Sequence, residues 1–479
     1  MRSRSLFPSL LLLGALSFTA ACSSGTSEPS GSASAGARPG PSPSPARTVD
    51  PSKIKGLEIV SDSSEHVSCP FATSYPDVPG AEAMTGAMKK DVEKRLADFR
   101  AAMCEGATGG AEGREFNISH QFLVASGDVL GVRLRTRDGS AAGSGLSDRT
   151  YWYDGEAGAY RTALGLVTRG AQDTFVAAVK KRLEGSPGVD AASLDDTFSD
   201  PASRAALLDD MAFTADGELR VGFDRGDVGV PAAGAHVVTL PRETITPWLS
   251  AFGKRVQQQT VRPSRSLDLG ASHVPAPAVP SHTASADDDT DCKKVKCIAL
   301  TFDDGPAVPE TATLLDHLAR YKARATFFVV GQNVVAHPDL VRAAARAGNE
   351  IGNHSLNHPD LTKLSPGQLA YQLDRTNAAV KAATGKAPTV FRPPYGAINP
   401  TVRRATTLSP VLWDVDTEDW KYRDAAKVAR TVIDKAQRND VVLMHDIHPT
   451  SVAAVPQILR TLTARGYHFV TVSHLRATL

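Results

Sequence analysis

The feature that most constrains the fold is an alternation of short apolar runs and amphipathic segments along residues 292–479. Segments between several of the runs repeat apolar residues at steps of three and four, which is typical of helices with one buried face. Repeated strand–helix units favour a parallel sheet, so the sequence predicts an α/β fold, a distorted (β/α) barrel of about seven parallel strands. The expected strands are CIALTF, ATFFVV, NEIG, TVFR, VLWDV, VVLM and YHFVTV.

Polar side chains follow five of these strands directly. Because the carboxyl ends of the strands of such a barrel meet at one mouth, we expect the five segments to converge there. The segments are Asp303-Asp304-Gly305-Pro306, Asn353–His358, Arg392–Gly396, Asp416–Trp420 and His445-Asp446.

Two histidines and one carboxylate can form a three-ligand site for a divalent metal. Taken alone, His354 and His358 are more often a hydrogen-bonded loop pair, and Asp303-Asp304-Gly305 is equally well a plain turn. Two adjacent carboxylates repel each other, however, unless a cation or an arginine offsets their charge. The combination favours a metal site in which one carboxylate is a ligand and the other stays free as a base.

The motifs TFDDGP, HSLNH, RPPYG, DTEDW and LMH resemble the five motifs of the polysaccharide deacetylases, the NodB-homology group of carbohydrate esterase family 4. They occur in family order and cover nearly all of residues 292–479. The resemblance implies a hydrolase that cleaves the amide (carbon–nitrogen) bond of N-acetylated sugars and releases acetate. It also implies that Asp304, His354 and His358 bind a divalent metal, most often Zn²⁺, with Co²⁺, Ni²⁺ or Fe²⁺ as alternatives.

The resemblance implies further catalytic roles. Asp303 is expected to be the general base for the attacking water, and His445 the general acid that protonates the departing sugar amine, which is a poor leaving group. Asp419 would orient and charge His445, and Arg392 would keep Asp303 ionised. The backbone N–H of Tyr395 would hold the developing oxyanion.

Three residues are expected on the substrate side by the same resemblance. Trp420 and Leu443 would form a small apolar slot for the acetyl methyl group, and Pro394 would contact the substrate. Read alone, Trp420 is more often a core residue. We expect Asp446 and His448 to be loop residues without a chemical role.

The N-terminus predicts export. Residues 1–22 combine two arginines, an apolar leucine-rich run and small residues before Cys22, which is typical of a cleaved signal peptide. The cysteine resembles the lipidated cysteine of a bacterial lipobox, although Thr19 replaces the usual leucine. We therefore expect an extracytoplasmic lipoprotein anchored to the membrane, with an ordinary secreted protein as the alternative. Residues 23–50 are rich in Ser, Pro and Gly and read as a disordered linker.

The five cysteines fit an exported protein. With Cys22 lipidated, four remain, which suits two disulfides in an oxidising environment. Cys292 and Cys297 are close in sequence and are expected to pair, which leaves Cys69 for Cys104.

Residues 52–256 predict an α+β domain, separated from the barrel by a Pro- and Asp-rich linker at 257–291. No catalytic constellation is recognisable in 52–256. Its layout, above all a strand at His236–Leu240 followed by Ile245–Leu249, resembles the extracytoplasmic domain of RsiV-type anti-sigma factors. That resemblance implies binding of a wall fragment or of lysozyme. One helical face is expected from Met84, Met88, Val92, Leu96, Phe99 and Met103.

Several functions remain open at this point. A membrane-anchored deacetylase would reach peptidoglycan, at MurNAc or GlcNAc, with chitooligosaccharides or acetylated xylan as alternative substrates. A non-haem iron oxygenase shares the two-His, one-carboxylate set, and a sensor with a vestigial barrel is a third class. The net charge of +1 gives no global field that would favour nucleic acid.

Overall fold

The computed structural model describes residues 49–64, 69–104, 115–139, 145–270, 278–282 and 289–479. The predicted signal peptide, Cys22 and nearly all of the 23–50 linker lie outside these residues. Within the described part of the chain, no helix is long and apolar enough to cross a bilayer.

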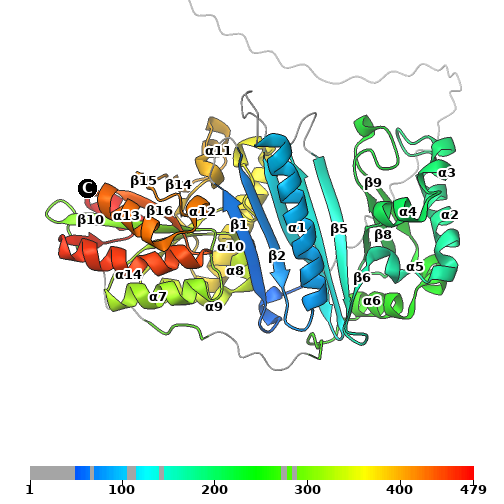
Figure 1. Ribbon diagram of the computed structural model, residues 1–479, viewed down its shortest axis with the longest axis horizontal. Coiled ribbons are helices and arrows are strands. Elements are labelled where there is room, and N and C mark those ends of the chain that lie inside the picture. The colour runs from blue at the N-terminus through cyan, green and yellow to red at the C-terminus, as the bar shows by residue number, and fades with distance from the viewer. Residues whose placement is uncertain (1–48, 65–68, 105–114, 140–144, 271–277, 283–288) are drawn as a thin grey trace, which may run out of the picture. The chain divides into compact units, whose positions relative to one another are not determined.

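Residues from 296 onward form a parallel sheet of eight strands (Figure 1). The strands pair in the order β14-β13-β12-β11-β10-β16-β15, with β17 against β10. Among the described residues no pairing joins β14 to β15, so the barrel stays open there, as the predicted distorted (β/α) barrel requires. The strands are β10 (Lys296–Asp303), β11 (Thr326–Val329), β12 (Glu350–Asn353), β13 (Val390–Phe391), β14 (Ser409–Pro410), β15 (Val415–Asp416), β16 (Val441–His445) and β17 (Tyr467–Phe469).

The strand predictions for this region are confirmed, with one exception and one addition. Six of the seven expected runs hold a strand of the sheet, because parallel strands covered on both faces are nearly all apolar. In β10, for example, every residue after Lys296 is buried. The run VLWDV contributes only Val415, the first residue of β15. The added strand is β14, whose two residues, a serine and a proline, carry no strand signal.

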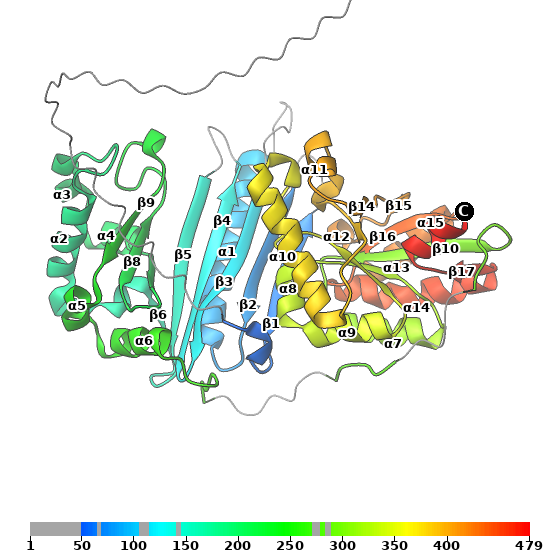
Figure 2. The same ribbon diagram turned by 180° about the vertical axis from the view of Figure 1, so that it is seen from behind.

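Helices pack along the outside of this sheet. Helices α7, α14 and α13 lie next to one another (Figure 1), and α10 lies against α8 and α9 on the other flank (Figure 2). The helices are α7 (Glu310–Arg320), α8 (Gly331–Ala336), α9 (Pro338–Arg346), α10 (Pro366–Thr384), α11 (Pro400–Arg404), α12 (Asp419–Tyr422), α13 (Ala425–Lys435), α14 (Pro449–Ala464) and α15 (Val472–Thr478).

The sequence sets the bounds of α10, a helix that borders the candidate site. Ser365 and Gln368 form a capping box at its start, in which each side chain accepts a backbone N–H of the other residue. At its end Gly385 adopts φ +82°, the left-handed conformation that glycine tolerates best. Between these caps Leu369, Leu373 and the residues in phase with them are buried.

The preceding region contains a six-stranded sheet with α1 (Glu82–Met103) against it (Figure 1). The predicted apolar face of α1 is confirmed, since all but its last member, Met103, are buried. The strands follow the order of the chain: β1 (Glu58–Ser64), β2 (Phe71–Asp77), β3 (Phe116–Ser126), β4 (Val129–Asp138), β5 (Gly145–Asp154) and β6 (Ala159–Thr162). Strand β1 is therefore an edge strand.

A second, smaller core follows the six-stranded sheet. It is built on a three-stranded antiparallel sheet, and a hairpin at Asp216-Gly217 joins its first two strands. The elements are α2 (Gln172–Leu183), α3 (Leu194–Thr197), α4 (Pro201–Leu207), β7 (Asp210–Phe213), β8 (Leu219–Phe223), β9 (His236–Leu240), α5 (Arg242–Ile245) and α6 (Ala251–Val261). The region thus has an α+β organisation around two apolar clusters.

The boundary predicted after residue 256 is wrong. Helix α6 continues to Val261, and the chain then runs along the six-stranded sheet, where the N–H of Asp268 donates to the carbonyl of Gly127. Leu267 and Leu269 pack against the core of that sheet. The sequence could not predict this boundary, because a Ser- and Pro-rich stretch looks like a linker. Single hydrogen bonds and side-chain contacts with a distant part of the chain can nevertheless hold such a stretch against a folded region.

Both expected cysteine pairs are disulfides in the structure. Cys292 joins Cys297 with a Cα–Cα distance of 5.4 Å, and Cys69 joins Cys104 at 5.6 Å. The first bridge lies at the start of β10, the strand that leads into the candidate site.

Candidate active site and metal centre

The two adjacent carboxylates stand at the carboxyl end of β10. In a regular strand, consecutive side chains point to opposite faces. Asp304 instead has φ +72°, a left-handed conformation that is uncommon outside glycine. Its loop is held by Asn333, whose Nδ2 donates to the carbonyl of Asp304 at 2.8 Å. This turn lets Asp303 and Asp304 approach the same histidine, since His354 Nε2 lies 3.7 Å from Asp303 Oδ2 and 3.5 Å from Asp304 Oδ1.

The residues predicted to bind metal are brought together. Asp304, His354 and His358 each offer one ligand atom, and these atoms lie within 4.8 Å of one another. His358 Nε2 is 3.4 Å from Asp304 Oδ1. His354 Nδ1 is 2.8 Å from the carbonyl oxygen of Arg392, to which a protonated Nδ1 donates, so that Nε2 keeps its lone pair for a metal. The donor set therefore fits a divalent cation such as Zn²⁺.

The loop that carries the histidines is fixed by α10. Gln372 accepts hydrogen bonds at Oε1 from the N–H groups of Leu356 and Asn357, at 2.9 and 3.2 Å, and donates from Nε2 to Asn357 Oδ1 at 2.7 Å. Ser355 Oγ accepts the N–H of His358 at 3.0 Å. The left-handed φ of +59° at His358 is held by these contacts.

Charges within the site affect its two carboxylates differently. Burial acts to raise the pKa of Asp304, but the nearby His358, His445 and His354 outweigh it, and the pKa is lowered. Burial raises the pKa of Asp303 although the Arg392 guanidinium opposes that change. Asp304 thus suits a permanently ionised ligand, and Asp303 suits a group that takes up a proton.

Arg392 holds Asp303 as the sequence predicted. Its Nη1 donates to Asp303 Oδ1 at 2.7 Å and to Thr301 Oγ1 at 2.8 Å. The guanidinium lies 4.3 Å from the ring centre of Phe328 and is fully buried. With the carbonyls of Val411 and Leu412, which also accept hydrogen bonds, four oxygens and an aromatic face hold the guanidinium in one position.

His445 and Asp419 form the second expected pair. His445 Nδ1 is 2.8 Å from Asp419 Oδ1, and the N–H of His445 donates to Asp419 Oδ2 at 2.8 Å. Burial acts to raise the pKa of Asp419, but His445, His448 and the hydroxyl of Ser451 lower it well below its usual range. An ionised Asp419 therefore stays beside His445 over the whole working pH range.

The remaining predicted residues lie at neighbouring strand ends. Pro394 and Tyr395 belong to a short 3₁₀ turn after β13, in which Tyr395 has φ +60°. Its ring lies edge-on to His358 at a centroid distance of 4.8 Å. Trp420 is in α12 directly after Asp419, and Leu443 is a fully buried residue of β16.

Three further residues lie close to His445 and Asp419, and their contacts were not predicted from the sequence. Ser451 donates to Asp419 Oδ2 at 2.6 Å, from the first turn of α14. His448 is buried, which lowers its pKa to about 3, and its ring centre lies 5.7 Å from that of His445. Burial raises the pKa of Asp446 to about 7. Asp446 accepts from Thr311 and lies so close to Gly305 that a Cβ there would clash with it. Asp446 and His448 do lie in the loop between β16 and α14, as expected, and both are buried there.

Fold and site together define a (β/α)-barrel protein with a candidate divalent-metal centre, a buried free carboxylate and an aspartate–histidine pair. A family model described as polysaccharide deacetylase matches residues 290–409. A peptidoglycan-N-acetylglucosamine deacetylase of Bacillus cereus is 40% identical over 189 residues, which cover 38% of this chain and 88% of that protein. The chain belongs to the polysaccharide deacetylase family.

Other relatives share the barrel region. The peptidoglycan-N-acetylglucosamine deacetylase PgdA of Listeria monocytogenes is 46% identical, over 38% of this chain and 39% of that protein. The peptidoglycan-N-acetylmuramic acid deacetylase PdaC of Bacillus subtilis is 44% identical, over 38% of each chain. The chain thus spans well under half the length of these curated relatives. The solved structure of PdaC is 43% identical, covers 38% of this chain and 91% of that chain, and gives a TM-score of 0.38.

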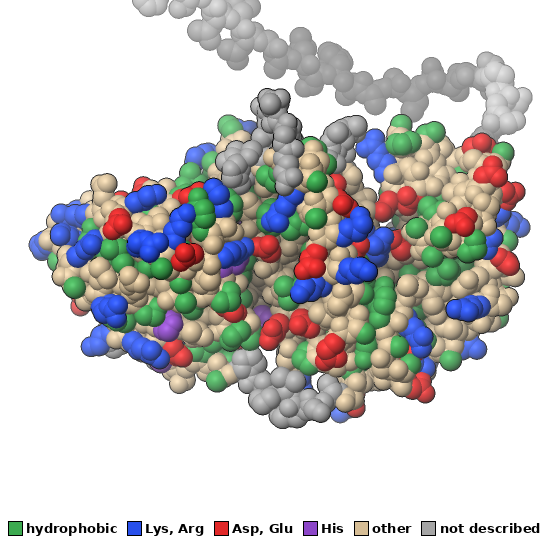
Figure 3. All heavy atoms as spheres, in the orientation of Figure 1, with side chains coloured by type: hydrophobic (Ala, Val, Ile, Leu, Met, Phe, Trp, Pro, Cys, Tyr) green, Lys and Arg blue, Asp and Glu red, His purple; other side chains and the backbone are tan. Residues whose placement is uncertain are grey.

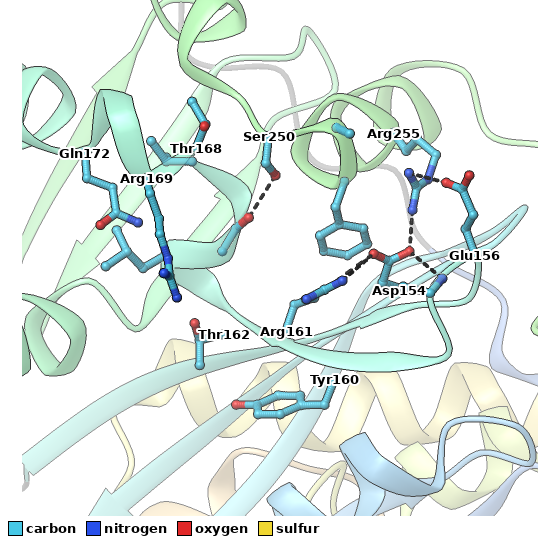
Figure 4. Close-up of a pocket in the computed structure, with 16 residues that line it drawn as sticks. Asp154, Glu156, Tyr160, Arg161, Thr162, Thr168, Arg169, Gln172, Ser250 and Arg255 are labelled. Atoms are coloured by element: carbon cyan, nitrogen blue, oxygen red, sulfur yellow. Dashed lines mark hydrogen bonds and ion pairs between the residues drawn. The ribbon is translucent and has the colours of Figure 1, made fainter.

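A separate pocket of about 1010 Å³ lies between β5–β6 and α6 (Figure 4). Arg161 and Arg255 both pair with Asp154 at its edge, and Arg255 also pairs with Glu156. Arg169 is exposed at the same pocket. On the face drawn in Figure 3, basic and acidic side chains are interspersed, in keeping with a net charge of +1.

Proposed function

We propose that the protein is a metal-dependent N-deacetylase that hydrolyses the acetamide of N-acetylated peptidoglycan sugars. The single observation that carries this proposal is the position of Asp303, a carboxylate next to the His354–His358–Asp304 set but held by Arg392. A free base beside a metal site is the arrangement that hydrolysis by an activated water requires.

The chemistry divides among these residues. A divalent metal bound by Asp304, His354 and His358 would polarise the acetamide carbonyl and make the attacking water more acidic. Asp303 takes a proton from that water, whose oxygen forms the new bond to the carbonyl carbon. His445, oriented by Asp419, gives a proton to the sugar nitrogen as the C–N bond breaks, so that acetate and a free amine leave. The backbone N–H of Tyr395 supports the developing oxyanion.

The names of the relatives support peptidoglycan as the substrate. Those relatives include deacetylases named for N-acetylglucosamine and for N-acetylmuramic acid of peptidoglycan. A relative 37% identical over 220 residues, from Pseudobutyrivibrio xylanivorans, is named a bifunctional xylanase/deacetylase, which favours acetylxylan as the second candidate. Chitooligosaccharides present the same acetamide and remain a third substrate.

Export and anchoring complete the proposal. The signal-like residues 1–22, with Cys22 as the lipidated residue, would hold the chain on the outer side of the membrane, within reach of the wall. The two disulfides support an oxidising location. Globomycin-sensitive processing and loss of membrane association in Cys22→Ser test the anchor.

Acetate release tests the activity. The zinc-loaded full chain is incubated with purified wall, chitotetraose and acetylxylan, and the muropeptides are analysed by mass spectrometry. We expect acetate from wall, with a loss of one acetyl group per modified sugar, and none with Asp303→Asn. Acetate from acetylxylan alone contradicts the peptidoglycan assignment, and turnover that requires Fe(II) and oxygen contradicts hydrolysis itself.

The pocket in Figure 4 favours a second function for the preceding region, the binding of a wall fragment. Arg169, Gln172 and Thr168 line it with polar groups suited to an acidic, hydroxyl-rich ligand. Titration of the full chain with soluble muropeptides or with lysozyme tests this role. Weaker muropeptide binding in Arg169→Glu than in the matched exposed variant Arg346→Glu supports it, and equal binding contradicts it.

A further inference from the structure

The candidate active site is closed to solvent. Asp303, Asp304, His354, His358 and His445 each expose at most 4% of their surface. The space left beside Asp304 and His358 is a cavity of about 20 Å³. On this measure ~10–15 Å³ is enough to hold one water molecule, so the space takes one or two waters and an N-acetyl group on a glycan does not fit.

Strand β1 supplies part of this closure. Ser61, Asp62 and Ser63 line the cavity together with Asp304 and His358. Ser63 Oγ donates a hydrogen bond of 2.5 Å to Oδ2 of Asp304. A hydroxyl from the preceding region thus contacts the carboxylate that is predicted to bind metal, 241 residues away in sequence.

Polar contacts continue around this mouth. Asp62 forms an ion pair with Arg423, which ends α12. Asn117 of β3 donates from Nδ2 to the carbonyls of Asn357 and His358, at 2.9 and 3.1 Å. Two further bonds join Gln332 Nε2 to the carbonyl of His120 at 2.5 Å and the N–H of Asp360 to Glu115 Oε1 at 2.6 Å.

The character of these contacts suits a reversible closure. Two of the hydrogen bonds end on buried carboxylates and favour the closed state, but each contact is a single polar interaction that water replaces when the surfaces part. Polar interfaces between regions of one chain commonly separate and re-form. The covalent connection nevertheless keeps β1 at high effective concentration near the mouth.

We propose that the segment Glu58–Ser64 (β1) is an intramolecular cap on the catalytic mouth, and that a glycan gains access only when β1 leaves. The proposal rests on the proposed function for what the cap excludes, an acetylated glycan. Only the fraction of chains with β1 released binds substrate, so the apparent affinity is the affinity of the open form multiplied by the open fraction.

A charge swap at the rim tests the cap. The full-length variants are Asp62→Arg, Arg423→Asp and the double exchange, with Asp98→Arg, an exposed residue of α1, as matched control. Asn117→Ala is a second, uncharged way to loosen the cap. Three readouts are compared: the rate at which a chelator removes bound zinc, the hydrogen exchange of residues 58–64, and acetate release from purified wall, the proposed substrate.

We expect Asp62→Arg, Arg423→Asp and Asn117→Ala to lose zinc and exchange β1 amides about two- to fivefold faster, with a matching rise in acetate release at low glycan concentration. In the double exchange, zinc loss and hydrogen exchange should return toward the wild-type rates. The control Asp98→Arg should show the wild-type rates. Unchanged zinc loss and hydrogen exchange in folded variants would overturn the cap. Faster zinc loss with a fall in acetate release would also overturn the cap. Displacing β1 would then harm catalysis, which would make Ser63 a positioning group for Asp304. Faster zinc loss and exchange with no acetate from any chain would refute the deacetylase function and leave the cap standing.

Discussion

Arg392 donates from Nη1 to Oδ1 of Asp303 at 2.7 Å, and neither side chain exposes more than 1% of its surface. A buried ion pair of this kind is costly to break, because removal of one partner leaves an uncompensated charge. The pairing therefore links the stability of the barrel to the protonation of the expected base.

Arg392→Lys is expected to separate these two effects. Lysine keeps the charge but loses the planar fork, whose Nη1 donates to Thr301 and Asp303 while Nε and Nη2 donate to backbone carbonyls of residues 411 and 412. Since Arg392 opposes the rise of the pKa of Asp303, its weaker replacement lets that pKa rise further, and the base is protonated to a higher pH. We expect kcat to fall about 10- to 100-fold, with the acidic limb of the pH–rate profile moved upward. Arg346→Lys on the exposed face of α9 is the control; an unmoved limb contradicts the assigned role.

Asp419→Asn is expected to disable the acid at His445. The carboxylate accepts from both Nδ1 and the N–H of His445, and asparagine keeps the size but not the charge. We expect kcat to fall about 100-fold or more, with zinc content unchanged, because Asp419 is not a ligand. Single-turnover acetate release with parallel metal analysis checks this. A loss of zinc equal to the loss of rate would place Asp419 in the metal site instead.

Gln372→Met is expected to weaken metal binding without contact with the metal. Gln372 holds the loop between the two histidines through the N–H groups of Leu356 and Asn357. Supporting partners of ligand loops typically contribute about tenfold or more to metal affinity. We expect the zinc Kd to rise about tenfold, measured by competition with a chelator. Gln258→Met, exposed on α6, is the matched control, and an equal Kd in both variants contradicts the role.

Asp224 should make stability depend on pH in the preceding region. Burial raises its pKa to about 7, with Asp227, Asp209 and Asp148 adding to that rise. Because the folded pKa lies above the unfolded value, the stabilising effect is complete at pH values below ~4 and is lost as pH rises through 7. Asp224→Asn should therefore raise Tm at pH 8 and leave it unchanged or lower at pH 4. Asp98→Asn serves as control, and an equal shift at both pH values contradicts the assignment.

Much of the barrel could be predicted from sequence because its strands and helices are marked by residues close together in the chain. Six buried parallel strands appear as apolar runs, and the caps of α10 are readable as Ser365, Gln368 and Gly385. Strand β14 could not be predicted, since Ser409 and Pro410 pair only because β13 lies beside them. The end of α6 was missed for a similar reason, because the chain beyond it is held by contacts with the distant Gly127 and Ser126.

The site shows the same division. Motif order and spacing identified the histidines and carboxylates, and the structure brings Asp304, His354 and His358 together. Ser451 was missed because it meets Asp419 only after α14 folds back, 32 residues along the chain. The contact of Ser63 with Asp304 has no signal in either segment, because a single serine in a strand is indistinguishable from a surface residue.

The position of β1 at the end of its sheet has a consequence for self-association. Among the described residues β2 alone pairs with it within the six-stranded sheet, and α8 and α12 also contact it. A released β1 presents a row of unpaired backbone N–H and C=O groups, which is a template for strand addition by another chain. Concentrated Asp62→Arg should therefore form soluble oligomers or fibrils that wild type does not, detectable by light scattering. The same seven residues that restrict the glycan would then also keep the chain monomeric.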